Sequence, residues 1–145
     1  MTRGMFAAVL GRMYGVDPSL YTGHSFNDVP ESVYYAPYVK WARENSILFG
    51  VSESSFEPER AVTRQEMAAM MHRFMKHVGL KPEIGGEEFS DSDAIDSWAR
   101  ESVISLRETG ILTGKPGNLF DPDASSTRAE ITTVLRRLIE YIVNQ

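Results

Sequence analysis

TRQEMAAMMHRF, residues 63–74, has the pattern of an amphipathic helix and occurs in the chain three times in related form. The other copies are TRGMFAAVLGRM, residues 2–13, and TRAEITTVLRRL, residues 127–138. In each copy, apolar residues stand four, seven, eight and eleven positions after the threonine, the spacing of one helical stripe. Three helices with the same stripe are expected to pack together around a shared core with pseudo-threefold symmetry.

The arginine of each Thr-Arg pair falls in the first turn of its helix, where the helix dipole makes a cation cost roughly 0.3–1 kcal/mol. These residues are Arg3, Arg64 and Arg128. A guanidinium beside the free N–H groups of a helix start is a ready site for a carboxylate or phosphate, so the recurrence favours an anion site. In the alternative, the arginine points to solvent or pairs with a loop carboxylate. The candidates are Glu57, Glu59, Asp121 and Asp123.

Two of the three helices carry a full start signal. Thr63 and Thr127 suit the N-cap, and Glu66 and Glu130, three residues on, can complete a capping box. The first copy has Met5 in place of the glutamate, so its helix start is weaker. On the dipole argument alone, replacing the arginines should leave stability unchanged or slightly raised.

A second repeated block precedes the later two Thr-Arg helices. YYAPYVKWARENSILFG, residues 34–50, aligns without gaps on WARESVISLRETGILTG, residues 98–114, and both read as helices that end in a glycine turn. FNDV and FSDS stand before these blocks, and FEPERAVTR and FDPDASSTR follow them. We expect one domain over residues 1–145, made of a partial motif and linker (1–25), a full motif and linker (26–88) and a second full motif (89–145).

Composition and motif content argue against several classes of function. The net charge of −5 argues against nucleic acid as a partner, and the absence of cysteine excludes disulfides and thiolate metal sites. No apolar run is long enough for a membrane span. His72 and His77 are five residues apart and do not share a helical face, and no hydrolase or calcium-loop motif occurs. We therefore expect no catalysis, no cofactor and no metal site.

The order of these motifs resembles the S-layer homology family, whose repeats carry F-x-D-V, a W-A helix, a G-I-x-x-G turn, an F-x-P loop and a T-R-A-E helix. FSDS…WARESVISLRETGILTG…FDPDASSTRAE matches that order nearly throughout. The resemblance covers essentially the whole chain and implies an all-α, three-pronged spindle. The Thr-Arg helices would form its central three-helix bundle, and the other helices and loops its prongs.

The resemblance also implies a function: non-covalent attachment of a bacterial surface protein to secondary cell-wall polysaccharide bearing pyruvate, and therefore an extracellular location in the cell wall or S-layer. The acidic sugar would contact the T-R-A-E arginine, here Arg64 and Arg128, and Arg3 in the altered copy TRGM. Other groove-lining candidates are Asp28, Asp91, Trp98, Tyr34, Gly50 and Gly114. A core position is an equal alternative for Trp98.

A structural or self-assembly module is the alternative function. Trp41 and Tyr38 would then mediate protein contacts within a surface layer, and Trp41 is expected to be exposed because its counterpart Ser105 is polar. The incomplete first motif also leaves a groove that another chain could complete, which would allow self-association.

Overall fold

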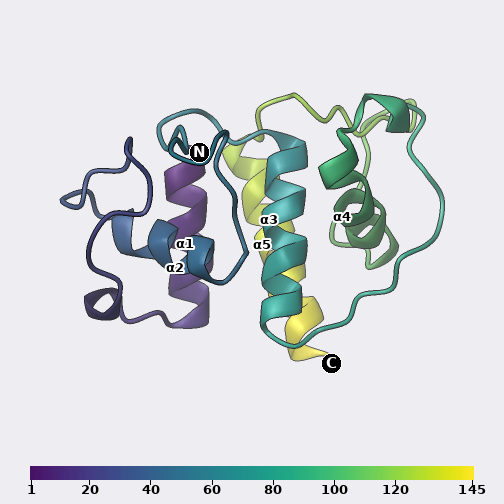
Figure 1. The fold of residues 1–145 in the computed structure, drawn as a ribbon. Helices are drawn as coiled ribbons and strands as arrows, with labels where there is room; N and C mark the ends of the chain where they lie inside the picture. Colours follow the sequence, from purple (N-terminus) through teal and green to yellow (C-terminus); the bar gives the residue numbers. More distant parts are fainter. The chain divides into compact units, whose positions relative to one another are not determined.

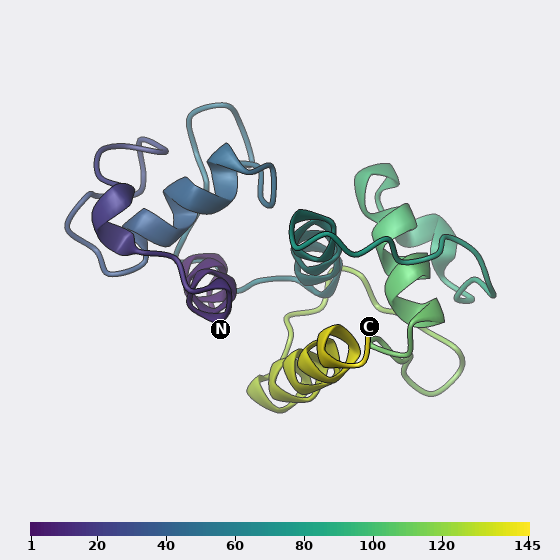
Figure 2. The ribbon, with the colours of Figure 1, turned by 90° about the horizontal axis from the view of Figure 1, so that it is seen from below.

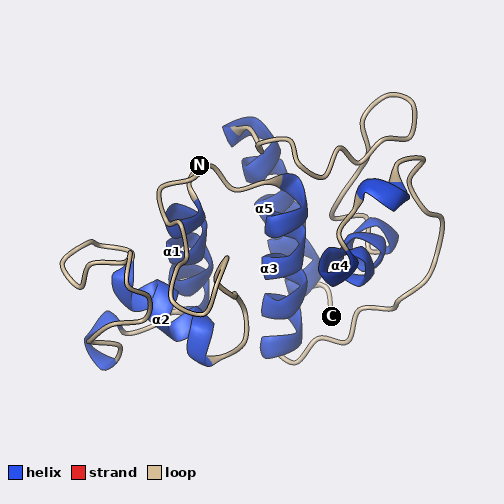
Figure 3. Ribbon diagram, turned by 45° about the horizontal axis from the view of Figure 1, so that its top comes forward, coloured by secondary structure: helices blue, strands red, loops and turns tan.

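The computed structural model describes all 145 residues, and its regular structure is entirely helical (Figure 3). The α-helices are α1 (Arg3–Tyr14), α2 (Ala36–Glu44), α3 (Arg64–His77), α4 (Ser97–Glu108) and α5 (Arg128–Val143), labelled in Figure 1. Two short 3-10 helices, Pro18–Leu20 and Ser92–Ala94, lie in the connections. The predicted all-α class is confirmed. None of the helices has the length and apolar character needed to cross a bilayer.

The chain divides into two compact units, Met1–Val62 and Thr63–Gln145. In the first unit α1 packs on α2, and Figure 2, which looks along α1, shows α2 beside it. In the second unit α3 packs on α4, and α5 follows the last loop. Each unit therefore joins the Thr-Arg helix that ends one sequence repeat to the first helix of the next repeat.

The helix starts follow the expected chemistry. Thr63 and Thr127 each accept a hydrogen bond from the amide three residues on, and the glutamates at those positions bond back to the amides of the caps. Thr2 accepts from the amide of Met5, but the methionine cannot return a bond. The two capping boxes are confirmed, and the first helix start has only the threonine half of the box.

Aromatic side chains fill the helix pair of the first unit. Trp41 is only 1% exposed and its ring lies 5.4 Å from that of Tyr14, while Tyr38 is 9% exposed. The expectation that Trp41 is exposed is therefore wrong. Its polar counterpart Ser105 is itself fully buried, so the polarity of that position did not indicate a solvent-facing surface.

A buried polar pair joins the helices of the second unit. His72 Nδ1 of α3 lies 3.1 Å from Ser102 Oγ of α4, and His72 Nε2 is buried without a partner. Burial lowers the pKa of His72, with a smaller contribution from the charge of Lys76. The imidazole is therefore held in its neutral form within the interface.

Candidate functional site

Arg64, the arginine in the middle Thr-Arg copy, is only 5% exposed. It lies in a socket formed by Thr113, Phe120 and Glu130. Its Nε donates to the carbonyl oxygen of Phe120 at 2.6 Å, and its Nη2 to that of Thr113 at 3.4 Å. Nη1 lies 3.2 Å from Glu130 Oε2, and the guanidinium carbon lies 4.9 Å from the centroid of the Phe120 ring. The side chain thus ties the glycine turn and the Phe-acid-Pro loop to the start of α3.

The backbone at the start of α3 makes a second set of contacts with the same loop. The amides of Arg64 and Gln65 donate to the carbonyls of Ala124 and Pro122 at 2.9 and 3.0 Å, and Thr63 forms a bridge with Ser125. N–H groups that a helix start leaves without intrahelical partners are therefore satisfied by the loop. The carbonyls take the place that a carboxylate or phosphate could occupy.

Asp91 and Gly114 hold the loop and turn in place. Asp91 accepts hydrogen bonds from the amides of Phe120 and Asp121 at 2.9 and 2.8 Å. Burial alone would raise the pKa of the Asp91 carboxyl, but these bonds and the charge of Arg64 outweigh it and lower the pKa. A Cβ atom on Gly114 would stand 2.7 Å from the Phe89 ring, so this position has no room for a side chain.

The first unit repeats this socket around Arg3, which is 4% exposed. Arg3 Nε donates to the carbonyl of Phe56 at 2.9 Å and Nη2 to that of Phe49 at 3.3 Å, and its guanidinium carbon lies 4.4 Å from the Phe56 ring centroid. Asp28 clamps the amides of Phe56 and Glu57 at 2.8 and 2.7 Å. A side chain on Gly50 would overlap the neighbouring backbone carbonyls. The arginine, aspartate and glycine of each predicted set are thus brought together.

The remaining candidates lie apart from the sockets. Trp98 and Tyr34 are 48% and 53% exposed, so Trp98 is a surface aromatic and not a core residue. The guanidinium carbon of Arg12 lies 5.4 Å from the Tyr34 ring centroid. Arg128 at the start of α5 is exposed, and its guanidinium makes no hydrogen bond or ion pair.

A second arginine in each unit is a feature that the sequence reasoning missed. The guanidinium carbon of Arg107 lies 4.2 Å from the Phe89 ring centroid, and that ring lies 5.4 Å from Phe120, which faces Arg64. In the first unit, Arg43, Phe26, Phe56 and Arg3 form the same series. The signal was available, because Arg43 and Arg107 occupy the same position of the two aligned helices.

Gln65 is another missed residue. Its Nε2 donates to Asp96 at 3.1 Å and to Asp123 at 2.9 Å, and its Oε1 accepts from the amide of Asp96. The other Thr-Arg helices have glycine or alanine at this position, so no repeat pattern pointed to it. The amide group bridges two carboxylates that would otherwise repel one another.

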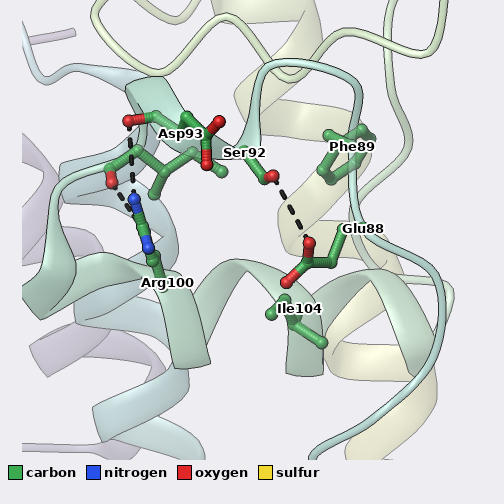
Figure 4. A pocket seen from close by; sticks show the side chains of 7 residues that line it. Glu88, Phe89, Ser92, Asp93, Arg100 and Ile104 are labelled. Carbon is green, nitrogen blue, oxygen red and sulfur yellow. Dashed lines mark hydrogen bonds between the residues drawn. The ribbon is translucent and has the colours of Figure 1, made fainter.

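A small hollow beside α4 shares Phe89 with the surroundings of the arginine socket but is not lined by Arg64 (Figure 4). It is lined by Glu88, Phe89, Ser92, Asp93, Ile95, Arg100 and Ile104. Arg100 is already bonded, since it donates to the carbonyls of Ile95 at 3.1 Å and Asp93 at 3.5 Å. With two carboxylates in its lining and its cation in use, the hollow does not suit an acidic ligand.

The motifs that build the sockets match a known family. The S-layer homology domain matches residues 25–68 and 88–132, together more than half of the chain. The chain therefore belongs to the S-layer homology domain family.

Several relatives align with nearly the whole chain. They include an amylopullulanase of Thermoanaerobacterium thermosulfurigenes, 32% identical over 97% of this chain and 8% of the enzyme. A cellulosome-anchoring protein of Acetivibrio thermocellus is 28% identical over 97% of this chain and 32% of that protein. An S-layer protein of Bacillus thuringiensis subsp. finitimus is 28% identical over 93% of this chain and 15% of its own length. The chain thus spans less than a third of the length of each of these relatives.

Proposed function

We propose that this chain is a non-covalent anchoring module that holds a bacterial surface protein to the cell wall. Its ligand would be an acidic secondary cell-wall polysaccharide, with pyruvate as the recognised group. The module lies outside the cell, in the wall or surface layer, and carries no catalysis of its own. An enzyme such as the amylopullulanase would owe its activity to the large part of its length outside this module.

One observation carries the choice of an acidic ligand: Arg128 is an exposed, unpaired cation at the start of a helix. A carboxylate there would accept bonds from the guanidinium and from the helix N–H groups. Because the net charge of the chain is −5, diffuse attraction would not hold an acidic polymer, and a specific cation is required.

We propose that Arg64 and Arg3 also contact the ligand, by exchanging a present hydrogen-bond partner for a carboxylate of the ligand. A guanidinium has five N–H donors, and the contacts of Arg64 with Phe120, Thr113 and Glu130 use three of them. Glu130 is 33% exposed, so a ligand carboxylate could replace it on Nη1. Asp28, Asp91, Gly50 and Gly114 would shape the socket, and the exposed rings of Trp98 and Tyr34 could stack on sugar.

The proposed assembly is one domain over residues 1–145, with the three Thr-Arg helices forming the bundle of a spindle. The alternative of surface-layer assembly through Trp41 and Tyr38 has lost its basis, since both rings are buried.

Sedimentation with purified cell walls tests the function. Intact walls are compared with walls stripped of polysaccharide and with walls from which only pyruvate has been removed. We expect binding to intact walls alone, and a loss of about tenfold, or about 1.4 kcal/mol, in Arg128→Ala. Arg136→Ala is the matched control, because Arg136 is an exposed arginine of the same helix. Equal binding to stripped walls would refute the proposal.

A further inference from the structure

The two helix pairs meet through side chains whose sizes are reversed between the units. We propose that these side chains form a pairing code, which lets α1 pack with α2 and α3 with α4 and excludes the two exchanged pairs. The code residues are Gly4, Gly11 and Tyr14 on α1, Tyr35, Tyr38 and Trp41 on α2 and its N-cap, Gln65, His72 and Met75 on α3, and Ala99, Ser102 and Ser105 on α4.

Gly11 and Tyr38 form the middle level of the code. A Cβ atom on Gly11 would overlap the Tyr38 ring, so this ring fills the interface of the first unit. In the second unit these positions hold His72 and Ser102, whose Nδ1 and Oγ atoms lie 3.1 Å apart, and the imidazole fills the interface instead. The other code residues stand three or seven positions away along each helix, a spacing that puts them on the same side.

Gly4 and Tyr35 form the level nearest the helix start. A Cβ atom on Gly4 would stand 2.8 Å from Cδ1 and Cε1 of the Tyr35 ring. Their equivalents, Gln65 and Ala99, are both buried, and here the larger side chain is on the Thr-Arg helix. The sizes are therefore reversed at this level as well.

A polar contact is kept through the reversal because its donor moves to the other helix. In the first unit the Tyr35 hydroxyl donates to Glu59, and in the second unit Gln65 Nε2 donates to Asp123 at 2.9 Å. Both acids directly follow the proline of their loop. An exchanged pair of helices would bring either two donors or none to this acid.

The third level lies toward the other end of the Thr-Arg helices. The buried Trp41 ring stacks on Tyr14, which is half exposed and leaves the interface to the tryptophan. In the second unit, Ser105 and Met75 take these positions and are fully buried. The large buried side chain is thus on α2 in the first unit and on α3 in the second.

Much of the remaining core is the same in both units. Val39 and Ile47 of the first unit are repeated as Val103 and Ile111 of the second, and all four are buried. The Thr-Arg helices also share one apolar stripe. Discrimination between native and exchanged pairs therefore rests on the code residues, whose sizes differ reciprocally.

Each exchanged pair would pack badly. Placing α2 on α3 would bring Tyr38 against His72, two large side chains in the space of one. Placing α4 on α1 would bring Ser102 against Gly11 and leave a cavity. The code thereby opposes the exchange of helices between neighbouring copies on a cell surface, the route by which chains form domain-swapped dimers.

A chimaera tests the code in the full chain. Residues 34–48 are replaced by the aligned residues 98–112, so that α1 meets a helix with the code of α4. The double change Gly4→Gln with Gly11→His, which gives α1 two levels of the α3 code, is made in the native chain and in the chimaera. The matched control, Gly4→Ala with Gly11→Ala, removes the same glycines without adding the code side chains.

Amide hydrogen exchange at Leu10, a buried residue of α1 that no variant changes, reports on the packing of the first unit. In the native chain we expect the double change to speed this exchange at least about tenfold, because it overfills the interface. In the chimaera the double change should slow exchange at least about tenfold relative to the alanine control, because its side chains fill the cavity. Met71 of α3 is the internal reference and should not change.

Opposite shifts in the two chains, with a slowing in the chimaera beyond that of the alanine control, support the pairing code. A shift of the same sign in both chains, no slowing in the chimaera, or a slowing that the alanine control matches overturns it. Because no polysaccharide is present, the result is independent of the wall-binding test.

Discussion

Gly11 lies so close to Tyr38 that a Cβ atom on the glycine would stand 2.5 Å from Cδ1 of the ring. In the second unit, His72 of α3 takes the place of Gly11, and Ser102 of α4 takes the place of Tyr38. The large residue is therefore on the Thr-Arg helix, and His72 forms a hydrogen bond with Ser102. Each helix pair therefore combines one large and one small side chain at this level of its interface.

Gly11→Ala tests this complementarity, because the sign of its effect on the free energy of unfolding should depend on the residue at position 38. In an isolated helix the substitution stabilises by roughly 1 kcal/mol. Here the added methyl meets the Tyr38 ring, and the overpacking should destabilise the first unit by about 1–3 kcal/mol. In a Tyr38→Ser background, Gly11→Ala should become stabilising. Urea unfolding of the four variants gives the coupling energy, and additive effects would show that the contact is not tight.

Arg64→Ala should destabilise the second unit by roughly 2–4 kcal/mol, although the helix dipole alone would predict no loss. The change leaves the buried carbonyl of Phe120 without its donor and removes the partner of Glu130. Arg64→Lys should recover only part of the loss, because an ammonium cannot reproduce the planar guanidinium contacts. Arg136→Ala, at an exposed site, should change stability by less than about 0.5 kcal/mol in the same thermal and urea measurements.

Gln65→Glu should destabilise the second unit more than Gln65→Ala. The glutamate would place a third carboxylate against Asp96 and Asp123 and would remove the amide that now donates to both. Gln65→Ala only deletes hydrogen bonds, at a cost of about 1–3 kcal/mol. Urea unfolding of the two variants measures the difference in the free energy of unfolding, and equal destabilisation would contradict this explanation.

Acid should loosen the packing of α3 on α4 through His72. The pKa of His72 is lowered in the fold by burial and by the charges of Lys76 and Arg73, opposed by Glu101 on α4. The unfolded chain therefore takes up a proton first, so the stability contributed by neutral His72 is complete above about pH 6.5 and is lost as pH falls below it.

His72→Gln removes the titration and should flatten this part of the stability curve. His24→Gln is the control, because the His24 side chain is 73% exposed. Equal pH profiles for native protein and His72→Gln would exclude the buried histidine as the cause.

The helices were predictable because their signals are local. Thr63 with Glu66 and Thr127 with Glu130 give the helix starts, and the apolar stripe gives the buried faces. Pro37 lies in the first turn of α2, which begins at Ala36, a position where proline is favoured.

The residues of the candidate site could be predicted from the sequence, but the contacts that they make could not. The repeats identified Arg64, Asp91 and Gly114, which the structure brings together around Phe89 and Phe120. The partners of Arg64 are backbone carbonyls some 50 residues away, and every residue type carries a carbonyl, so no sequence pattern could point to them. The prediction that Trp41 is exposed was wrong for a related reason, because the exposure of this ring depends on the helix that packs against α2.

The two compact units do not follow the sequence repeats, because α1 packs with α2 and α3 with α4 across the repeat boundaries. Recombination between genes that cuts at a repeat edge, such as Ser25, would separate α1 from the residues that cover it. A crossover between Val62 and Thr63 would transfer each core intact. Shuffled modules of this kind should therefore carry their crossover points immediately before the Thr-Arg helix.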